Sequence, residues 1–451
     1  NFATPVTGNI TLYAKWTQNV LTVTFISNGS VVATQTVDTT SDDWNAGRAT
    51  IVKLPNWPGY QFDGWYTDTT WSAKYDFTQE VTASLTLYAK WTSTSWIHVG
   101  EILQDTVGLH SDIVYDSTGT PYIAYFTYEY ENYEYVGSPG YLKKYVNGAW
   151  QDVGMPEDLE LLDTRFTNLY TLLAFDSMDN LYWVLYGLED LAVYKLAAGT
   201  STWEHIGDLG FDDSYEYPTS IAVDSNDHLY VAYTASQTYT IVIEKYNGST
   251  WETVSERGEF PDSSEIPIIG FGQDDVLYML YRPYDGGYYR RVAKLVDGQW
   301  QDITDANLLN VSDAVMAIGP DKLPYVVYRT GNQMAVIKYR NGIWEPVGDT
   351  SFVSLRDDYS SYMTIDFDQY GAIYVSYQDH ALEDKVSVIK YEAEWSILGN
   401  AGLSTGAVQF HGISIDPGGN AYVYYIDHTF KPIEAIMGDS EGELIIRKYT
   451  P

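Results

Sequence analysis

The sequence predicts an all-β protein in which a small repeat module precedes a seven-bladed β-propeller. A strand pattern that carries a tyrosine occurs seven times after residue 95, at spacings of 47 to 60 residues, which is the period of propeller blades. Hairpin turns divide each copy, and no helical period interrupts it. Unpaired strand patterns at the two ends of this region would complete one blade together. We therefore expect two regions, residues 1–94 and residues 95–451.

The first region contains an internal repeat. NFATPVTGNITLYAKW at residues 1–16 matches DFTQEVTASLTLYAKW at residues 76–91 with a constant offset of 75 residues. Residues 1–16 are therefore expected to be the C-terminal part of a preceding repeat, and residues 17–94 to be a complete module. The shared TLYAKW alternates apolar and polar positions, as a half-buried strand does. The module should be mostly β.

Three motifs of this module carry a family resemblance. GYQFDGWYTD (59–68), YDF (75–77) and LTLYAKW (85–91) resemble the Listeria–Bacteroides repeat, the B-repeat of internalin-type surface proteins. The resemblance implies a β-grasp-like fold that serves as a stalk or spacer in bacterial cell-surface proteins and has no catalytic role. The central segment NAGRATIVKLPNWP (45–58) departs from the family pattern, so this loop is expected to differ.

Each propeller copy pairs a second-strand tyrosine with a turn residue six positions earlier. That residue is always Asp or Gly, as a tight hairpin requires. The pairs are Asp116 and Tyr122, Asp176 and Tyr182, Asp224 and Tyr230, Gly272 and Tyr278, Gly319 and Tyr325, Asp368 and Tyr374, and Asp416 and Tyr422. The polar turn in SIAVDSNDHLYVAY (220–233) changes composition in the other six copies, so we interpret it as scaffold.

The remaining strands of each copy are marked by alternation, hairpin turns and tryptophan. Large apolar residues flank a small one before each turn, a strand period expected where sheets converge on an axis, and Asp366 is the anomalous polar residue at this small position. Asn-Gly and Asp-Gly dipeptides then predict a hairpin into the fourth strand. The fourth strands begin at Trp96, Trp150, Trp203, Trp251, Trp300, Trp344 and Trp395.

The ends of the second region predict how the ring is closed. Trp96–Gly100 reads as a fourth strand without the preceding three, and Lys448-Tyr449 ends a third strand with no fourth behind it. Pairing residues 95–100 with the last blade would remove the open edge. In detail the blades resemble NHL-type propellers and those of bacterial surface proteins. Such propellers include both binding scaffolds and lyases, so the fold alone does not indicate which function this chain has.

Charge excludes two classes of partner. The chain carries a net charge of −36, of which −2 falls in residues 1–94 and −34 in the remainder. A field of this sign repels phosphate backbones and anionic lipids, so we expect no nucleic acid binding and no membrane insertion. It indicates either a soluble secreted surface or an acidic face for cationic or calcium-bridged ligands. Cysteine is absent, which excludes disulfides, zinc knuckles and thiol nucleophiles.

The chain begins with Asn and no apolar signal region follows, so we expect a mature chain or an excised fragment. No stretch approaches the ~18 apolar residues that a bilayer-spanning helix needs.

Two long second-to-third strand loops are candidate binding surfaces. Residues 126–140 and 426–443 lie in the first and last blades, which are neighbours across the closure. The first loop holds Tyr128, Tyr130, Tyr133 and Tyr135 among glutamates. Flat rings and carboxylates suit a sugar or a protein partner. The alternative is a solvated loop that packs on its own tyrosines.

Histidines and arginines form a second group of candidates. An aspartate next to a histidine is typical of a general base or a metal ligand, and such residues gather at the same mouth of the ring. They are His110, Asp379, His380, His411, Asp427 and His428. The alternative is a turn residue of the repeat consensus. Arg282 and Arg329, equivalent in the fourth and fifth blades, would clamp an anion or form strand-end salt bridges.

Dedicated catalytic motifs are absent from the sequence. It contains no sialidase boxes, no HExxH, no phosphate-cradling glycine loop and no serine elbow. Asp366-Phe-Asp368-Gln-Tyr-Gly371 keeps two of the three carboxylates of a calcium loop, but Asp366 is predicted to lie in a strand. We expect no cofactor, with calcium as the one ion left open.

These observations favour a non-enzymatic extracellular protein, on the bacterial cell surface or secreted. A B-repeat stalk would present a propeller that binds a glycan or a host or neighbour-cell protein. The alternative from another class is a polysaccharide lyase or hydrolase that acts at the channel mouth through the histidines above. A purely structural role is the third hypothesis.

Overall fold

The structure is a computed structural model, and every structural statement below refers to the residues that it describes. These are residues 7–8, 21–37, 47–54, 57, 59–100, 112–125, 128–131, 134–137, 141–157, 171–186, 191–209, 216–235, 240–255, 263–283, 289–311, 313–350, 353–355, 362–427 and 442–450. The chain divides into two compact units, residues 1–55 with 62–92, and residues 56–61 with 93–451. The preceding-repeat segment 1–16 lies almost entirely outside the described residues.

The N-terminal unit is built on one mixed four-stranded sheet. Its strands are β1 (Leu21–Ser27), β2 (Ser30–Val37), β3 (Tyr60–Tyr66) and β4 (Leu85–Ser93), in the order β2-β1-β4-β3. β1 and β2 form a hairpin around Asn28 and Gly29, both at positive φ, whereas β1 and β4 run parallel. The parallel pair lies at the centre of the sheet.

The core of this unit follows from the strand alternation. Phe25 of β1 and Leu87 of β4 are fully buried, and Trp65 of β3 is 2% exposed. The Trp65 ring meets Phe25 edge to face at 4.8 Å, and its indole nitrogen donates to the Val52 carbonyl at 3.1 Å. Aromatic burial with a satisfied indole therefore holds Trp65 of the GWY motif in the core of this unit.

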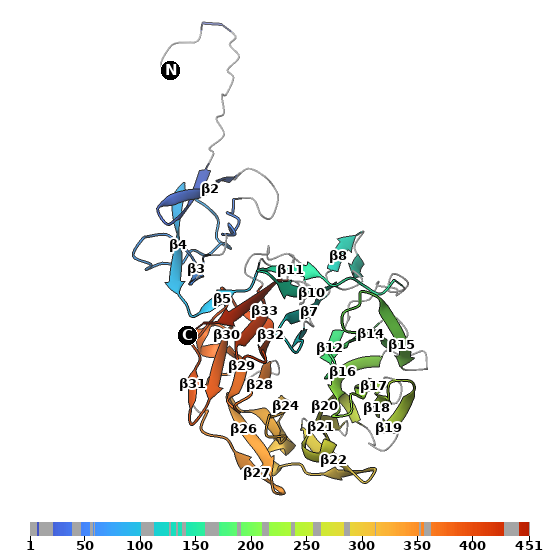
Figure 1. The fold of residues 1–451 in the computed structure, drawn as a ribbon. Helices are drawn as coiled ribbons and strands as arrows, with labels where there is room; N and C mark the ends of the chain where they lie inside the picture. The colour runs from blue at the N-terminus through green and yellow to red at the C-terminus, as the bar shows by residue number, and fades with distance from the viewer. Residues whose placement is uncertain are drawn as a thin grey trace. The chain divides into compact units, whose positions relative to one another are not determined.

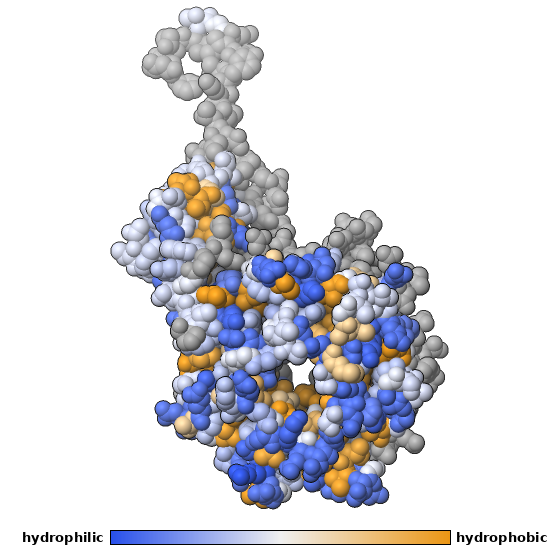
Figure 2. All heavy atoms as spheres, viewed as in Figure 1, coloured by the Kyte–Doolittle hydropathy of each residue, from blue (hydrophilic) through white to orange (hydrophobic). Residues whose placement is uncertain are grey.

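The second unit consists of seven four-stranded antiparallel sheets arranged like the blades of a propeller (Figure 1). Successive strands of the chain are neighbours within a blade, and Figure 1 shows the first strands facing the centre of the ring. In Figure 2 the side chains surround a central opening. The predictions of an all-β fold and of seven sheets are confirmed.

The strands of the first four blades have the following bounds. Blade 1 comprises β6 (Asp112–Tyr115), β7 (Pro121–Tyr125), β10 (Tyr141–Val146) and β11 (Ala149–Asp152); blade 2 comprises β12 (Thr171–Phe175), β13 (Leu181–Tyr186), β14 (Leu191–Leu196) and β15 (Trp203–Leu209). Blade 3 comprises β16 (Glu216–Val223), β17 (Leu229–Ala235), β18 (Thr240–Tyr246) and β19 (Trp251–Ser255); blade 4 comprises β20 (Ser263–Phe271), β21 (Leu277–Pro283), β22 (Arg291–Val296) and β23 (Gln299–Asp302).

The last three blades follow the same order. Blade 5 comprises β24 (Ala314–Ile318), β25 (Pro324–Thr330), β26 (Gln333–Arg340) and β27 (Ile343–Pro346); blade 6 comprises β28 (Met363–Phe367), β29 (Ile373–Asp379), β30 (Lys385–Tyr391) and β31 (Trp395–Ile397). Blade 7 comprises β32 (Val408–Ile415), β33 (Ala421–Asp427), β34 (Glu443–Tyr449) and β5 (Trp96–His98). Short 3-10 helices η2 (Gln273–Asp275), η3 (Ala306–Asn310) and η4 (His380–Leu382) connect strands. Among the described residues, no helix is long and apolar enough to cross a membrane.

Blade 7 takes its outer strand from the beginning of the unit. β5 pairs antiparallel with β34, so that Trp96 lies opposite Tyr449 and His98 opposite Arg447. The rings of Trp96 and Tyr449 are 5.3 Å apart. With this pairing blade 7 has four strands, like each of the other six blades.

The apolar core lies between neighbouring blades. One buried cluster contains Val388 of blade 6 and Val423 of blade 7, and another contains Ile123 of blade 1 and Ile446 of blade 7. Each large apolar side chain contributes about 1.5–3 kcal/mol when fully buried, so these interfaces stabilise the unit. Neighbouring blades therefore stabilise one another.

Tryptophans on the outer strands link successive blades. At six of the seven outer strands the indole nitrogen donates to a backbone carbonyl in, or just after, the preceding blade's outer strand. The bonds run from Trp96 to Leu398 (3.0 Å), Trp150 to Val99 (2.8 Å), Trp203 to Gly154 (3.2 Å), Trp251 to Ile206 (2.8 Å), Trp344 to Ile303 (2.6 Å) and Trp395 to Val347 (2.6 Å). In these six cases the segment after one tryptophan accepts a bond from the tryptophan of the next blade.

A glycine often follows the accepting carbonyl because the next indole lies directly against it. Gly348 has φ +68°, and a Cβ there would lie 2.7 Å from the ring of Trp395. Gly100 has φ +74°, and a Cβ there would lie 2.6 Å from the ring of Trp150. The repeat W-x-x-V-G therefore combines a donor, an acceptor and the space that the next donor needs.

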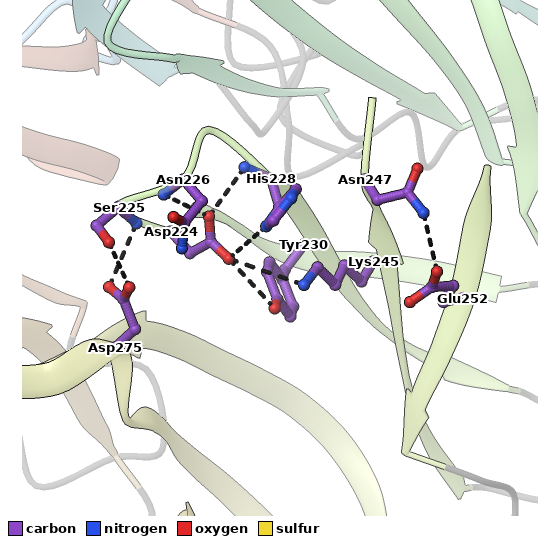
Figure 3. A network of polar contacts seen from close by, with 9 residues as sticks. All are labelled: Asp224, Ser225, Asn226, His228, Tyr230, Lys245, Asn247, Glu252 and Asp275. Carbon is purple, nitrogen blue, oxygen red and sulfur yellow. Dashed lines mark hydrogen bonds and ion pairs between the residues drawn. The ribbon is translucent and has the colours of Figure 1, made fainter. Parts of the chain in front are cut away.

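The polar turn of blade 3 forms a closed network (Figure 3). Asp224 Oδ1 accepts the backbone N–H groups of Asn226 and His228, each at 2.9 Å. Its Oδ2 lies 2.9 Å from His228 Nδ1 and accepts from the Tyr230 hydroxyl at 3.4 Å. Lys245 lies 4.0 Å from the same carboxylate and 5.4 Å from the centre of the Tyr230 ring. The side chains of Asp224, His228 and Tyr230 therefore satisfy one another, as scaffold requires.

The same turns also connect blades 1 to 4. In each case a serine that follows the turn residue donates through its backbone N–H and its hydroxyl to an aspartate in the next blade. The pairs are Ser117 and Asp179, Ser177 and Asp227, and Ser225 and Asp275. Figure 3 shows the last of these bonds. The acidic turn residues therefore hold neighbouring blades together.

The glycine of the W-x-x-V-G repeat can be tested with a matched pair of variants. Gly348→Ala should destabilise the protein by roughly 2–4 kcal/mol, because it adds overlap with Trp395 to the strain of positive φ. Gly154→Ala should cost only about 1–2 kcal/mol, because Gly154 has φ +89° but no atom within 4 Å of a Cβ. Urea unfolding of both variants measures the difference, and equal losses would contradict the packing role of the glycine.

Candidate functional site

The first predicted loop contains a hairpin. β8 (Tyr128–Glu131) and β9 (Glu134–Gly137) pair antiparallel, and the backbone of Tyr130 lies directly across from that of Tyr135. Tyr133 lies outside the described residues, as do residues 428–441 of the second long loop. A ligand-binding role for these tyrosines stays a prediction.

His411 is the predicted site histidine that the structure places in most detail. It lies in β32 and is 6% exposed. Its Nε2 lies 3.0 Å from the Tyr362 carbonyl and its Nδ1 lies 2.9 Å from the Ser376 hydroxyl. A carbonyl only accepts, so Nε2 carries the hydrogen and Nδ1 accepts from Ser376. Burial lowers the pKa of His411 to about 4. The ring is therefore neutral at pH 7 and joins blade 7 to blade 6.

The predicted pair Asp379 and His380 has different partners for each member. Asp379 ends β29, is buried, and accepts from the hydroxyls of Tyr377 at 3.2 Å and Ser387 at 3.1 Å. His380 begins η4, and its Nδ1 lies 3.0 Å from Asp384. The Asp379 carboxylate and the His380 ring therefore bind different partners.

The remaining predicted residues of this group are only partly described. Asp427 is 1% exposed and accepts the backbone N–H of Thr405 at 3.1 Å. His110 and His428 lie outside the described residues. The lyase or hydrolase hypothesis therefore stays untested.

Of the two arginines, Arg329 adopts the salt bridge that the sequence left as an alternative. Its Nε lies 2.9 Å from Asp313 Oδ2, and its Nη1 donates to the Gly331 carbonyl at 3.4 Å. Arg282 lies in β21, where its backbone pairs with that of Glu265 on β20.

Asp366, the anomalous residue at the small position, links two blades. Its Oδ2 accepts the Ile415 N–H of blade 7 at 2.7 Å, and its Oδ1 accepts the Phe367 N–H at 2.8 Å. Asp368 accepts from Tyr370, Ala372 and the Tyr374 hydroxyl at 2.9 to 3.1 Å. Both carboxylates of the weak calcium motif therefore have structural partners. Within the described ranges, no group of three or more His, Asp or Glu could hold a metal ion.

A cleft of about 770 Å³ lies between blades 4 and 5. It is formed by the end of the blade 4 outer strand, helix η3 and the β26–β27 hairpin. Its lining residues are Arg291, Asp302, Ile303, Thr304, Asp305, Ala306, Leu309, Tyr339, Gly342, Ile343 and Trp344. None of them was predicted from the sequence as a site residue. We call this group the 4/5 cleft.

The apolar wall of the 4/5 cleft consists of side chains that the fold leaves uncovered. Ile343 is 58% exposed and Leu309 is 43% exposed. Leu308 is fully buried and Val311 is 5% exposed, so η3 is anchored in the core while Leu309 faces outward. Exposed large apolar residues that gather at one concave place are a common mark of a ligand site.

A sequence signal for this wall exists in the repeat. The residue before each outer-strand tryptophan is small or polar in six copies and is the exposed Ile343 in blade 5. The others are Ser95, Ala149, Thr202, Thr250, Gln299 and Glu394. Ile343 therefore departs from the repeat pattern, and this departure is the sequence signal that could have identified the cleft.

The polar side of the 4/5 cleft is an ion pair. Arg291 Nη1 donates to Asp302 Oδ2 at 2.9 Å, with side-chain exposures of 37% and 49%. Asp302 Oδ1 accepts the backbone N–H of Thr304 at 2.8 Å. Burial alone would raise the pKa of Asp302, but the hydrogen bonds from Thr304 and the charge of Arg291 outweigh it, so this pKa lies below its ordinary value. Asp302 is ionised at neutral pH.

Two aromatic rings complete the lining. Tyr339 and Trp344 are 5.2 Å apart at an angle of 50°. Because Trp344 donates to the Ile303 carbonyl of blade 4, the tryptophan link forms the base of the cleft. Aromatic and aliphatic surface beside an exposed ion pair can bind a ligand that has both an apolar face and hydroxyl groups.

Comparison with known families concerns the N-terminal unit. The family model of the Listeria-Bacteroides repeat domain matches residues 22–90, which contain the strands β1 to β4 apart from their outermost residues. Residues 22–90 are a Listeria–Bacteroides repeat. The family predicted from the GWY and LYAKW motifs is confirmed. The 4/5 cleft belongs to the propeller-like unit and not to the Listeria–Bacteroides repeat.

Two curated relatives come from Evansella cellulosilytica. One is named as a Gly-rich membrane protein and is 40% identical over 90 residues, which are 19% of this chain and 10% of that protein. The other is named as a membrane protein and is 38% identical over 86 residues, which are 18% of this chain and 12% of that protein. The chain spans about a tenth of the length of these relatives.

Several solved structures are similar in fold. A protein from Lactobacillus plantarum has a TM-score of 0.44 and 17% identity, covering 69% of this chain and 93% of its own. The SapL1 lectin in complex with α-methyl fucoside has a TM-score of 0.42 and 11% identity, covering 67% and 97%. An ulvan lyase has a TM-score of 0.44 and 11% identity, covering 77% and 94%. Likeness at this level carries no argument about function.

The buried state of His411 predicts a pH dependence of stability. With an ordinary pKa of 6.5 in the unfolded chain and about 4 in the fold, the unfolded chain binds more protons between these values. The free energy of unfolding should therefore fall as pH drops from 6.5 towards 4, by up to about 1.4 kcal/mol per pH unit. Urea unfolding of the wild type and of His411→Gln across this window measures it. The variant should show a shallower slope, and identical slopes would contradict the assignment.

Proposed function

We propose that this chain is part of a bacterial cell-surface or secreted protein in which the Listeria–Bacteroides repeat is a spacer and the propeller binds an extracellular glycan. The observation that carries the proposal is the 4/5 cleft, where exposed Ile343 and Leu309 lie beside the Arg291–Asp302 pair. A glycan offers both an apolar ring face and hydroxyl groups, so it fits both walls. A protein ligand in place of the glycan is the second form of this proposed binding role.

The repeat supports the surface location and the spacer role. Membership of residues 22–90 in this repeat family supports a stalk or spacer role in a bacterial surface protein. The mixed sheet with its parallel β1–β4 pair supports a β-grasp-like fold. In this proposal residues 17–94 are the complete spacer module and residues 1–16 are the end of a preceding one. Residues 95–451 are the binding head.

We further propose that the ring is closed by its N-terminal strand, which makes the head a rigid scaffold. Three contacts of β5 support this. β5 pairs with β34, Trp96 donates to Leu398 of blade 6, and Trp150 of blade 1 donates to Val99 just after β5. On both sides β5 therefore makes the contacts that the other outer strands make.

The charge supports a solution or surface ligand rather than nucleic acid or lipid. The net charge of −36 repels phosphate-rich partners. The β8–β9 hairpin with Tyr128, Tyr130 and Tyr135 remains a second predicted contact surface. No cofactor enters the proposed role.

The proposal predicts that a single substitution at an exposed position weakens glycan binding. Ile343→Asp should reduce binding to a glycan array at least about tenfold, because it replaces apolar contact surface with a charge that must be desolvated. Ala149→Asp places the same charge at the equivalent position of blade 1 and serves as the matched control. The full 451-residue chain is used for both variants, with a thermal melt to confirm folding.

Two outcomes would contradict the proposal. One is the absence of glycan binding by the wild-type chain on an array of bacterial and host glycans. The other is binding that Ile343→Asp and Ala149→Asp reduce equally. Depolymerisation of a bound polysaccharide would instead favour the lyase or hydrolase hypothesis.

A further inference from the structure

We propose that the 4/5 cleft selects a neutral saccharide that presents two adjacent hydroxyl groups. The Arg291–Asp302 pair would bind the two hydroxyls, and Ile343 and Leu309 would contact the apolar face of the sugar ring. This inference rests on the proposed function and adds the chemical class of the ligand.

The ion pair offers one donor and one acceptor side by side. Arg291 Nη1 and Asp302 Oδ2 are 2.9 Å apart, and neither side chain is buried. A guanidinium has five N–H groups and a carboxylate about four lone-pair positions, so both retain capacity beyond their mutual bond. One sugar hydroxyl can donate to Asp302 while its neighbour accepts from Arg291. A single isolated hydroxyl would use only half of this arrangement.

Both charged groups are held in place before a ligand arrives. The Thr304 N–H fixes Asp302 Oδ1 at 2.8 Å, and the Thr304 hydroxyl accepts from the Val292 N–H at 3.0 Å. The Arg291 guanidinium lies 5.8 Å from the centre of the Tyr289 ring. Pre-positioned polar groups lower the entropic cost of binding, which matters most for a small and weakly bound ligand.

The charge of the cleft favours a neutral ligand over an acidic one. Asp302 already neutralises Arg291, and Asp305 adds a further carboxylate that caps η3 through the Asn307 N–H at 2.8 Å. An acidic sugar would have to displace Asp302 from Arg291 and approach a chain with a net charge of −36. A neutral sugar meets neither obstacle.

The apolar wall adds the second half of the recognition. Ile343 and Leu309 are 58% and 43% exposed, and covering them removes apolar surface from water. Gly342 lines the cleft next to Ile343, and a Cβ at this position would meet no atom within 4 Å. The entrance beside the wall is therefore open.

The test compares neutral and acidic monosaccharides on the full chain. Methyl glycosides of the common hexoses, 6-deoxyhexoses, hexosamines and hexuronic acids are titrated by saturation-transfer NMR and calorimetry. We expect at least one neutral glycoside with adjacent hydroxyls to bind at neutral pH. Asp302→Asn and Arg291→Gln should each weaken it about tenfold or more, since each removes a hydrogen bond to a charged group. Ala149→Asp should leave the affinity unchanged.

The outcomes separate this inference from the proposed function. Binding of hexuronates or hexosamines alone, abolished by Ile343→Asp, would overturn the neutral class while the glycan-binding function stands. Neutral binding that neither Asp302→Asn nor Ile343→Asp affects would place the ligand elsewhere and overturn the inference. If no glycoside binds and the glycan array shows no binding, both this inference and the proposed function are wrong. Thermal melts of the variants distinguish lost contacts from lost folding.

Discussion

At six of the seven outer strands a tryptophan indole donates to a backbone carbonyl of the blade before it, and the packing of these blades depends on this bond. A buried indole N–H has to be satisfied, so the bond fixes both the spacing and the rotation of neighbouring blades. The accepting carbonyl follows the preceding tryptophan by three or four residues, as Val347 follows Trp344. Five of the seven outer strands are therefore donor to one neighbour and acceptor for the other, which leaves the loops free to vary.

Several conspicuous polar residues also hold turns and neighbouring blades together. Asp224, Asp366 and His411 each satisfy backbone or side-chain groups of their own turn or of an adjacent blade. Polar groups placed between blades have to be fully paired, because an unpaired one costs about 1–3 kcal/mol. The 4/5 cleft differs in kind. Its ion pair is half-exposed and its apolar residues are uncovered, so these groups retain the capacity to bind a ligand.

The sequence predicted the strands and turns of the propeller, but it did not predict which side chains meet across strands. Asn147-Gly148 and Asn341-Gly342 adopt the positive φ values that their hairpins require. In contrast, Asp379 and His380 are adjacent in sequence but have different partners. Successive strand residues point to opposite faces, so Asp379 contacts Tyr377, two positions earlier, while His380 on η4 contacts Asp384. Adjacency at a strand end is a poor guide to a functional pair.

The sequence by itself determined the family of the first module, the number of blades and the order of their strands. The family rests on the resemblance of the GWY and LYAKW motifs. The number of blades and the order of their strands follow from the two-residue period of strands and from turn chemistry, both of which act over a few residues. Only the tertiary structure decided where a ligand could bind. The 4/5 cleft combines residues 291–309 of one blade with residues 339–344 of the next. Whether an apolar residue such as Ile343 is covered depends on the neighbouring blade, which is packing between distant segments rather than local propensity.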